Sequence, residues 1–167
     1  YKTAPVTLSF VNGLLKPILG ETVNYINALD IAKERAIDVQ EIISTRAEEF
    51  TNCIKVEIKT DKLPFFVLGA LSGNNQPRIV KINQVYVEAI PEGNILFIHN
   101  NDKPGLVGAV GTILGEGHIN IAGITLGTQP EKGTAISVVN VDSEVPDSIV
   151  ARLKATPNIL YIKALKV

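Results

Sequence analysis

Apolar residues recur every three or four positions over residues 3–19 and again over residues 23–36, which is the repeat of an amphipathic helix. Pro17 is expected to end or kink the first helix, because proline lacks the backbone N–H that a helix interior uses. The chain is therefore expected to open with two helices. Their apolar positions are Val11, Leu14, Leu15 and Ile18 in the first, and Val23, Ile26, Leu29, Ala32 and Ala36 in the second.

After residue 38 the apolar residues fall into the short, alternating runs of β-strands. Two helices followed by such strands indicate an α+β domain, in which the helices pack on an antiparallel sheet. The joint Pro91-Glu92-Gly93 ends this first domain, which is expected to span residues 1–91. Its strands are predicted at residues 39–43, 54–59, 65–68, 79–82 and 85–90.

The second domain, residues 92–167, follows the order βαββαβ, which is the ferredoxin-like arrangement. The predicted fold class is therefore α+β, with a ferredoxin-like domain after the first domain. The expected strands are 94–100, 119–127, 133–142 and 159–166, and the expected helices are 105–116 and 146–154.

Three glycines lie inside the predicted helix 105–116, where each costs up to about 1 kcal/mol relative to alanine. They are Gly108, Gly111 and Gly115. Close approach of another backbone is the usual compensation. Both the domain's own sheet and a neighbouring subunit stay open as the source of that backbone.

The composition excludes several classes of function. A formal net charge of −1 leaves no basic face of the kind that binds nucleic acid, and the apolar runs are shorter than the roughly 20 residues of a membrane span.

Cys53 is the one cysteine, so it is expected to be a small core residue in a reducing, cytoplasmic protein. Because the chain begins at Tyr1 and contains no methionine, we expect it to be part of a longer protein.

No catalytic or metal-binding pattern stands out in the sequence. His99 and His118 have no metal-ligand spacing, and no serine lies in a nucleophile elbow. The polar loop after the apolar run 95–98 is a better candidate site, because it leads onto a helix whose first N–H groups and positive dipole end favour polar ligands. The sequence therefore indicates a regulatory, ligand-binding role.

Residues 95–127, with N-x-D-x-P-G at 100–105 and H-I-N-I at 118–121, resemble an ACT domain, the ferredoxin-like module that senses amino acids in biosynthetic enzymes. Residues 19–35 and 77–93 are similar to the allosteric, intervening domain of the D-3-phosphoglycerate dehydrogenase family. This resemblance implies a regulatory region that holds no cofactor. It further implies that NAD-dependent oxidation of 3-phosphoglycerate, the entry to serine synthesis, is carried out by domains upstream.

The resemblance also implies an L-serine site between the ACT domains of two subunits, and self-association into a dimer or tetramer. The Asp102 carboxylate would pair with the ligand's ammonium group, while asparagine amides would donate and accept hydrogen bonds. The helix start would favour the ligand's carboxylate. In the alternative interpretation, Asp102 is only a helix cap. The implied effector residues are Asn100, Asp102, Pro104, Gly105, Leu106 and Asn120.

A second site is implied in the first domain. Arg78 matches a basic position of the family that is proposed to bind substrate or phosphate anions, and Lys81 would assist. Alternatively, both are solvated strand residues.

Two other functions stay open for the whole chain. One is an L-serine dehydratase β-type chain, which also joins a related domain to an ACT domain. The other is a stand-alone amino-acid-binding ACT module without catalysis.

Overall fold

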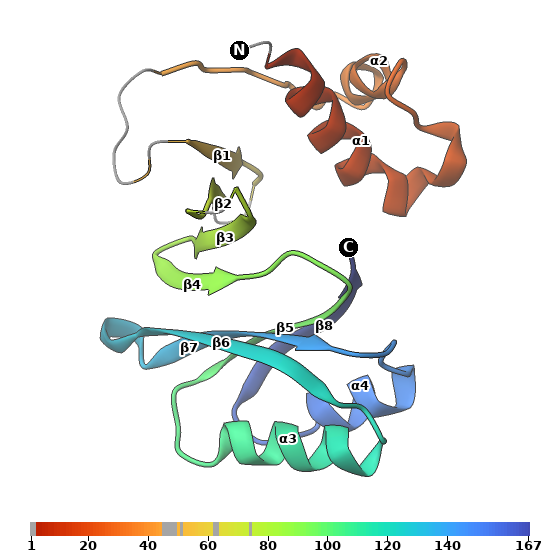
Figure 1. Cartoon of the computed structure of the whole chain (residues 1–167). Helices are drawn as coiled ribbons and strands as arrows, with labels where there is room; N and C mark the ends of the chain where they lie inside the picture. The colour runs from red at the N-terminus through yellow and green to blue at the C-terminus, as the bar shows by residue number, and fades with distance from the viewer. Residues whose placement is uncertain (1–2, 45–49, 51, 62–63, 74) are drawn as a thin grey trace. The chain divides into compact units, whose positions relative to one another are not determined.

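Figure 1 shows the helices and strands in their order along the chain. The computed structural model describes every residue except 1–2, 45–49, 51, 62–63 and 74. By packing, the chain divides into two units, Tyr1–Arg46 and Ala47–Val167. This division differs from the boundary expected at residues 91–93, because the first sheet packs against the second within one unit. The boundary between sequence domains stays a prediction.

The first unit contains helix α1 (Ala4–Leu19), the short 3-10 helix η1 (Gly20–Thr22) and helix α2 (Ala28–Glu34). Both predicted helices are present and pack against each other. The predicted apolar stripes are wrong in part, because the following members are exposed: Ile18, Ile26, Leu29 and Ala36. The packing of these helices on the first sheet stays a prediction. The buried residues of the unit are Val11, Leu15, Val23, Ala28 and Ala32.

Helix α2 is shorter than the predicted stretch 23–36, because side chains ahead of it bind the backbone. The Asn24 Oδ1 accepts hydrogen bonds from the backbone N–H groups of Ile26 at 2.8 Å and Asn27 at 3.2 Å. Such local bonds compete with the hydrogen bonds of a helix. The helix therefore begins only at Ala28, and Ile26 is left 91% exposed.

The predicted strand at residues 39–43 is wrong. This segment joins neither of the two sheets, and it is tied to α1 instead. The Glu41 carboxylate accepts hydrogen bonds from the hydroxyl groups of Thr3 and Thr7. These bonds, that of Thr3 first, hold the pKa of Glu41 below its ordinary value. The apolar, β-branched residues of this segment indicated an extended chain. A strand also needs a neighbouring strand to pair with, and composition does not show whether one is present.

The first sheet is antiparallel and has the strand order β1-β2-β3-β4. Strand β1 lies at the end of this order, next to β2, and is an edge strand. Cys53 at its start is exposed, so the expectation of a buried core cysteine is wrong. The strands are β1 (Cys53–Ile58), β2 (Phe65–Leu71), β3 (Pro77–Ile82) and β4 (Val85–Ala89).

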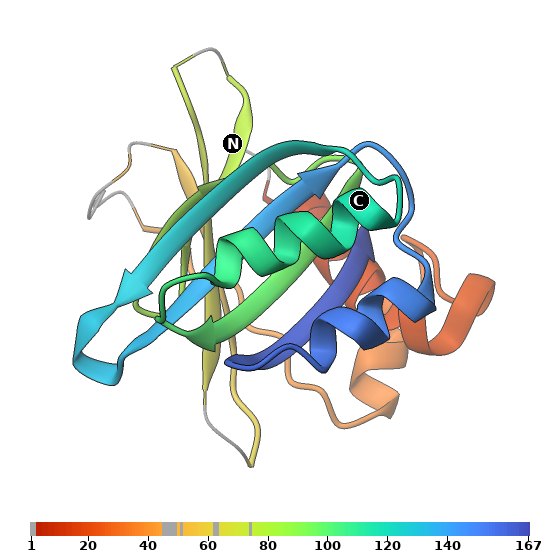
Figure 2. The ribbon, with the colours of Figure 1, turned by 90° about the horizontal axis from the view of Figure 1, so that it is seen from below.

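The second sheet is also antiparallel, in the order β6-β7-β5-β8, which is the ferredoxin-like order that the sequence predicted. Helices α3 and α4 lie across one of its faces (Figure 2). The α+β class and all six predicted elements of this domain are confirmed. They are β5 (Asn94–Asn101), α3 (Leu106–Glu116), β6 (Ile121–Gln129), β7 (Thr134–Val141), α4 (Asp147–Lys154) and β8 (Ile159–Lys166).

The second sheet has a hydrophobic core on each face, because successive strand residues point to opposite sides. Leu96 and Ile98 of β5 pack under the helices. Ile95 of the same strand packs with Val85 and Val87 of β4 on the other face. The first sheet therefore covers part of the face that the helices leave open.

The glycines of α3 do not approach the sheet. A Cβ atom built on Gly108, Gly111 or Gly115 would meet nothing within 4 Å. Compensation by the domain's own sheet is therefore wrong, and close approach of a neighbouring subunit stays a prediction.

Candidate ligand-binding site at the start of α3

The candidate site is the junction between β5 and α3. Strand β5 ends at Asn101, and α3 begins at Leu106 after a Gly105 cap with φ 92°. The Gly105 carbonyl accepts the first helical bond, from the Ala109 N–H at 3.0 Å, and no side chain caps the helix. The N–H groups of the first turn therefore point out of the helix without a side-chain acceptor. Such a helix end favours an anionic group.

Asn100 lies beneath this junction and is only 2% exposed. Its Nδ2 donates to the backbone carbonyl of Asn101 at 2.8 Å, but its Oδ1 has no hydrogen-bond partner. Buried polar atoms are nearly always paired, so this oxygen requires an explanation. A ligand with a hydrogen-bond donor would supply one.

Asp102 is exposed in the loop between β5 and α3. Its backbone N–H donates to the carbonyl of Gly133 at 2.8 Å, which fastens the loop to the start of β7. The capping interpretation of Asp102 is wrong, because the N-cap residue is Gly105 and no side chain bonds to the helix start. The Asp102 carboxylate is thus exposed at the mouth of the junction. Pro104 beside it is exposed, whereas Leu106 is buried and anchors the helix.

Asn120 lies at the opposite end of the sheet. It precedes Ile121, which faces Val141, and Val141 in turn faces Asn94 at the start of β5. Its backbone N–H donates to the Asp142 carboxylate at 3.1 Å. The structure of one chain therefore brings Asn100 and Asp102 together but leaves Asn120 apart, with the 11 residues of α3 between them.

Arg78 and Lys81 lie on the same face of the first sheet. A β-bulge in β3 makes Arg78 face Ala70 and Lys81 face Leu68, which are two residues apart on β2. Without the bulge, positions three apart would point to opposite faces. The Lys81 Nζ lies 4.4 Å from the centre of the Tyr86 ring.

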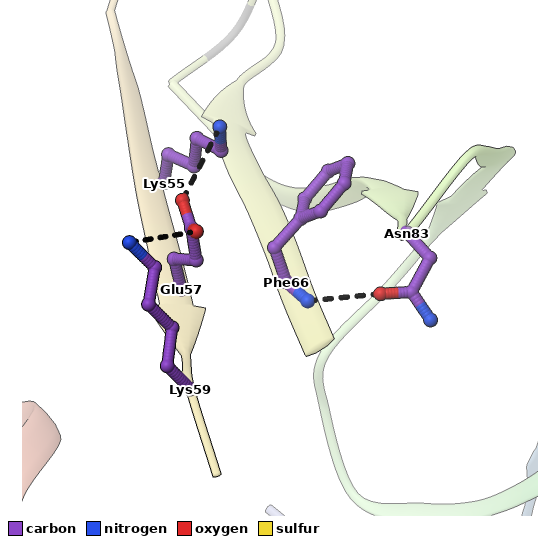
Figure 3. Close-up of polar contacts among 5 residues, drawn as sticks. All are labelled: Lys55, Glu57, Lys59, Phe66 and Asn83. Carbon is purple, nitrogen blue, oxygen red and sulfur yellow. Dashed lines mark hydrogen bonds and ion pairs between the residues drawn. The ribbon is translucent and has the colours of Figure 1, made fainter. Parts of the chain in front are cut away.

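The edge strand β1 adds charges to this sheet (Figure 3). Glu57 lies between two lysines, with its carboxylate 3.7 Å from the Lys55 Nζ and 3.5 Å from the Lys59 Nζ. The Lys55 Nζ also lies 5.0 Å from the centre of the Phe66 ring. By strand register, Lys55 faces Leu68, so it shares a face with Lys81.

Ser137 is the residue that sequence reasoning missed. It is 3% exposed on β7, and its Oγ has no hydrogen-bond partner. A single serine within the apolar run 135–139 was the available signal, but an isolated serine in a strand is not distinctive.

In the described ranges, no helix is long and apolar enough to cross a bilayer. Across the same residues, no three His, Cys, Asp or Glu side chains gather where they could hold a metal ion.

Comparison with known proteins agrees with this architecture. The family described as "ACT domain" matches residues 94–158, which contain the β5–α3 junction. The chain is thus an ACT-domain protein. The family described as "D-3-phosphoglycerate dehydrogenase intervening domain" matches residues 1–83. With these two domains in this order, the chain belongs to the D-3-phosphoglycerate dehydrogenase family and corresponds to its C-terminal regulatory region.

Curated relatives are similar over nearly the whole chain. The D-3-phosphoglycerate dehydrogenase of Bacillus subtilis is 35% identical over 98% of this chain and 31% of its own length. That of Methanocaldococcus jannaschii is 39% identical over 95% of the chain and 30% of its own length. The chain thus spans about a third of the length of these relatives. The matches favour the dehydrogenase over the serine dehydratase alternative.

Proposed function

We propose that this chain is the amino-acid-sensing, self-associating part of a cytoplasmic D-3-phosphoglycerate dehydrogenase, and that it binds L-serine or a similarly small amino acid. The observation that carries the proposal is the unpartnered Oδ1 of Asn100 beneath the uncapped start of α3. In the whole protein, domains outside this chain oxidise 3-phosphoglycerate with NAD. The names of the curated relatives support this enzyme.

The chemistry of the junction suits an amino acid. The first N–H groups of α3 are donors for the ligand's carboxylate, and the exposed Asp102 carboxylate is a counter-charge for its ammonium group. Asn100 offers an acceptor to a further donor of the ligand. These three kinds of contact match the three polar parts of L-serine.

A second copy of the chain completes the site in this proposal. Asn120 is distant from Asp102 within one chain, so it contributes only if another ACT domain brings its own Asn120 to the junction. The position of β6 at the edge of the second sheet supports such pairing, because edge strands present unpaired backbone groups. The glycine stripe of α3, which faces open space, also supports a closely approaching neighbour.

The test is calorimetric titration of the 167-residue chain with L-serine, on samples whose mass is measured by sedimentation equilibrium. We expect a dimer or larger species that binds serine. Asp102→Asn should lower the affinity at least tenfold, because it removes the counter-charge of the ammonium group without removing a helix cap.

Asp147→Asn is the matched control, since Asp147 is also exposed and lies in the first turn of the other helix of the domain, α4. It should bind serine as the wild type does. A monomeric chain would refute the shared site. Absence of binding to serine, alanine and glycine alike would refute amino-acid sensing.

We also propose a second, anion-binding site at Arg78 and Lys81. The bulge that gives both residues one face of the first sheet supports it. Inorganic phosphate should therefore bind weakly, and Arg78→Gln should reduce the binding measured by calorimetry. Equal phosphate affinity of the variant and the wild type would mean that Arg78 is a solvated strand residue.

A further inference from the structure

Strand β8 carries a β-bulge where it runs beside the candidate site. Asn100 of β5 pairs with Ile159, and Leu160 is an extra residue on β8. A bulge of this kind bends its strand, and bulges often lie next to functional sites, where they re-aim a side chain. Here the bulge advances the pairing by one residue, so that Asn101 comes to lie next to Asn158.

Asn158 accepts two hydrogen bonds from Asn101. Its carbonyl accepts one from the Asn101 backbone N–H at 2.9 Å, and its Oδ1 accepts one from the Asn101 Nδ2 at 3.4 Å. Asn101 in turn orients the buried Asn100, because the Asn101 carbonyl accepts a hydrogen bond from the Asn100 Nδ2 at 2.8 Å. The Asn100 Oδ1 is thereby left as the unpartnered atom. Asn158 therefore acts on Asn100 through Asn101.

The backbone of Asn158 is left-handed, with φ 72°. It is the third residue of the turn 156–159, which is closed by a hydrogen bond from the Ile159 N–H to the Thr156 carbonyl at 3.2 Å. Glycine is the usual residue at a left-handed third position, because it has no Cβ. Glycine would keep the turn and the carbonyl bond, but it has no Oδ1. The side chain of Asn158 therefore supplies something that the turn itself does not need.

We propose that Asn158 is a positioning residue of the ligand site, which holds Asn101 so that the Asn100 Oδ1 stays available to the ligand. This inference rests on the proposed amino-acid-sensing function. A binding group that supporting hydrogen bonds hold in place costs less to order when the ligand arrives. Without the Asn158 side chain the ligand must order the Asn101 segment itself, so affinity falls while the fold is kept.

The experiment is calorimetric titration of the 167-residue chain with L-serine, accompanied by urea denaturation of each variant. Asn158→Gly should lower serine affinity about fivefold, which is the effect of one hydrogen bond. Its urea midpoint should stay close to that of the wild type, because glycine suits the left-handed turn position. A purely structural residue would change the midpoint instead.

A double-mutant cycle tests whether the effect passes through Asn101. Asn101→Ala removes the same side-chain bond from its other end, so it should also lower serine affinity about fivefold. The double variant should bind serine no more weakly than either single variant, because the shared bond can be lost only once.

Asn75→Gly is the matched control. Asn75 is also left-handed, with φ 56°, but it lies in the turn between β2 and β3 of the first sheet. It should change neither serine affinity nor the urea midpoint.

The outcomes separate the two proposals. If the wild type binds none of serine, alanine and glycine, amino-acid sensing fails and this inference fails with it. If the wild type binds serine and Asn158→Gly binds it equally well, sensing stands and the role of Asn158 is refuted. Additive losses in the double variant, a lowered urea midpoint of Asn158→Gly, or an equal loss of affinity in Asn75→Gly would each refute that role as well.

Discussion

Gly127→Ala is expected to destabilise the Ala47–Val167 unit by about 3 kcal/mol, at the upper end of the usual range for overpacking. A Cβ atom on Gly127 would lie 1.9 Å from the backbone oxygen of Tyr86 and 2.5 Å from a methyl carbon of Val85. The first of these atoms belongs to the backbone of β4 and cannot rotate away. The substitution must therefore push β4 off the second sheet, where Val85 and Val87 form a shared core with Ile95.

Urea denaturation measures this effect, and Gly123→Ala is its matched control. Gly123 lies on the same strand, β6, but a Cβ atom there would meet nothing within 4 Å. The control should change the free energy of unfolding by less than about 1 kcal/mol. Equal stability of the two variants would mean that the first sheet does not press on β6 as described.

Asn100→Leu is expected to abolish ligand binding while leaving the fold as stable as the wild type or more so. Leucine has the same number of side-chain heavy atoms as asparagine and the same branch point at Cγ, and it removes an acceptor that has no partner in the protein. The one bond lost is that from Nδ2 to the carbonyl of Asn101. The ligand, in contrast, loses an acceptor at the inner end of its site, so serine affinity should fall more than tenfold.

Asn140→Leu should behave in the opposite way. The Asn140 Nδ2 donates to the carbonyls of Ile90 at 3.0 Å and Glu92 at 3.1 Å, which ties the joint between the sheets to β7. Its loss should cost about 1–2 kcal/mol of stability and leave serine binding unchanged. Thermal unfolding and calorimetry on both variants test the contrast. Strong destabilisation by Asn100→Leu would show that Asn100 serves the fold rather than a ligand.

The spacing of apolar residues along the chain predicted most of the secondary structure correctly. In the second domain all six elements were placed within a few residues, because apolar side chains alternate there with the period of the element that they form. The wrong predictions concern places where side-chain hydrogen bonds or the position of a strand in its sheet determine the structure. Asn24 delays the start of α2 by binding the backbone, and residues 39–43 have strand composition without a strand beside them. Cys53 is exposed because β1 lies at an edge.

The sequence also predicted the β5–α3 junction. An apolar run, a polar loop and a Pro-Gly step are local signals of a strand that leads into a helix, and they do not depend on the rest of the fold. Only the tertiary structure decided what surrounds that junction. It left the Asn100 oxygen unpaired, added Ser137 from β7, excluded capping by Asp102, and put Asn120 at the far end of the sheet. The physical reason is that strand register joins residues distant in sequence, whereas periodicity reports only on residues that are near.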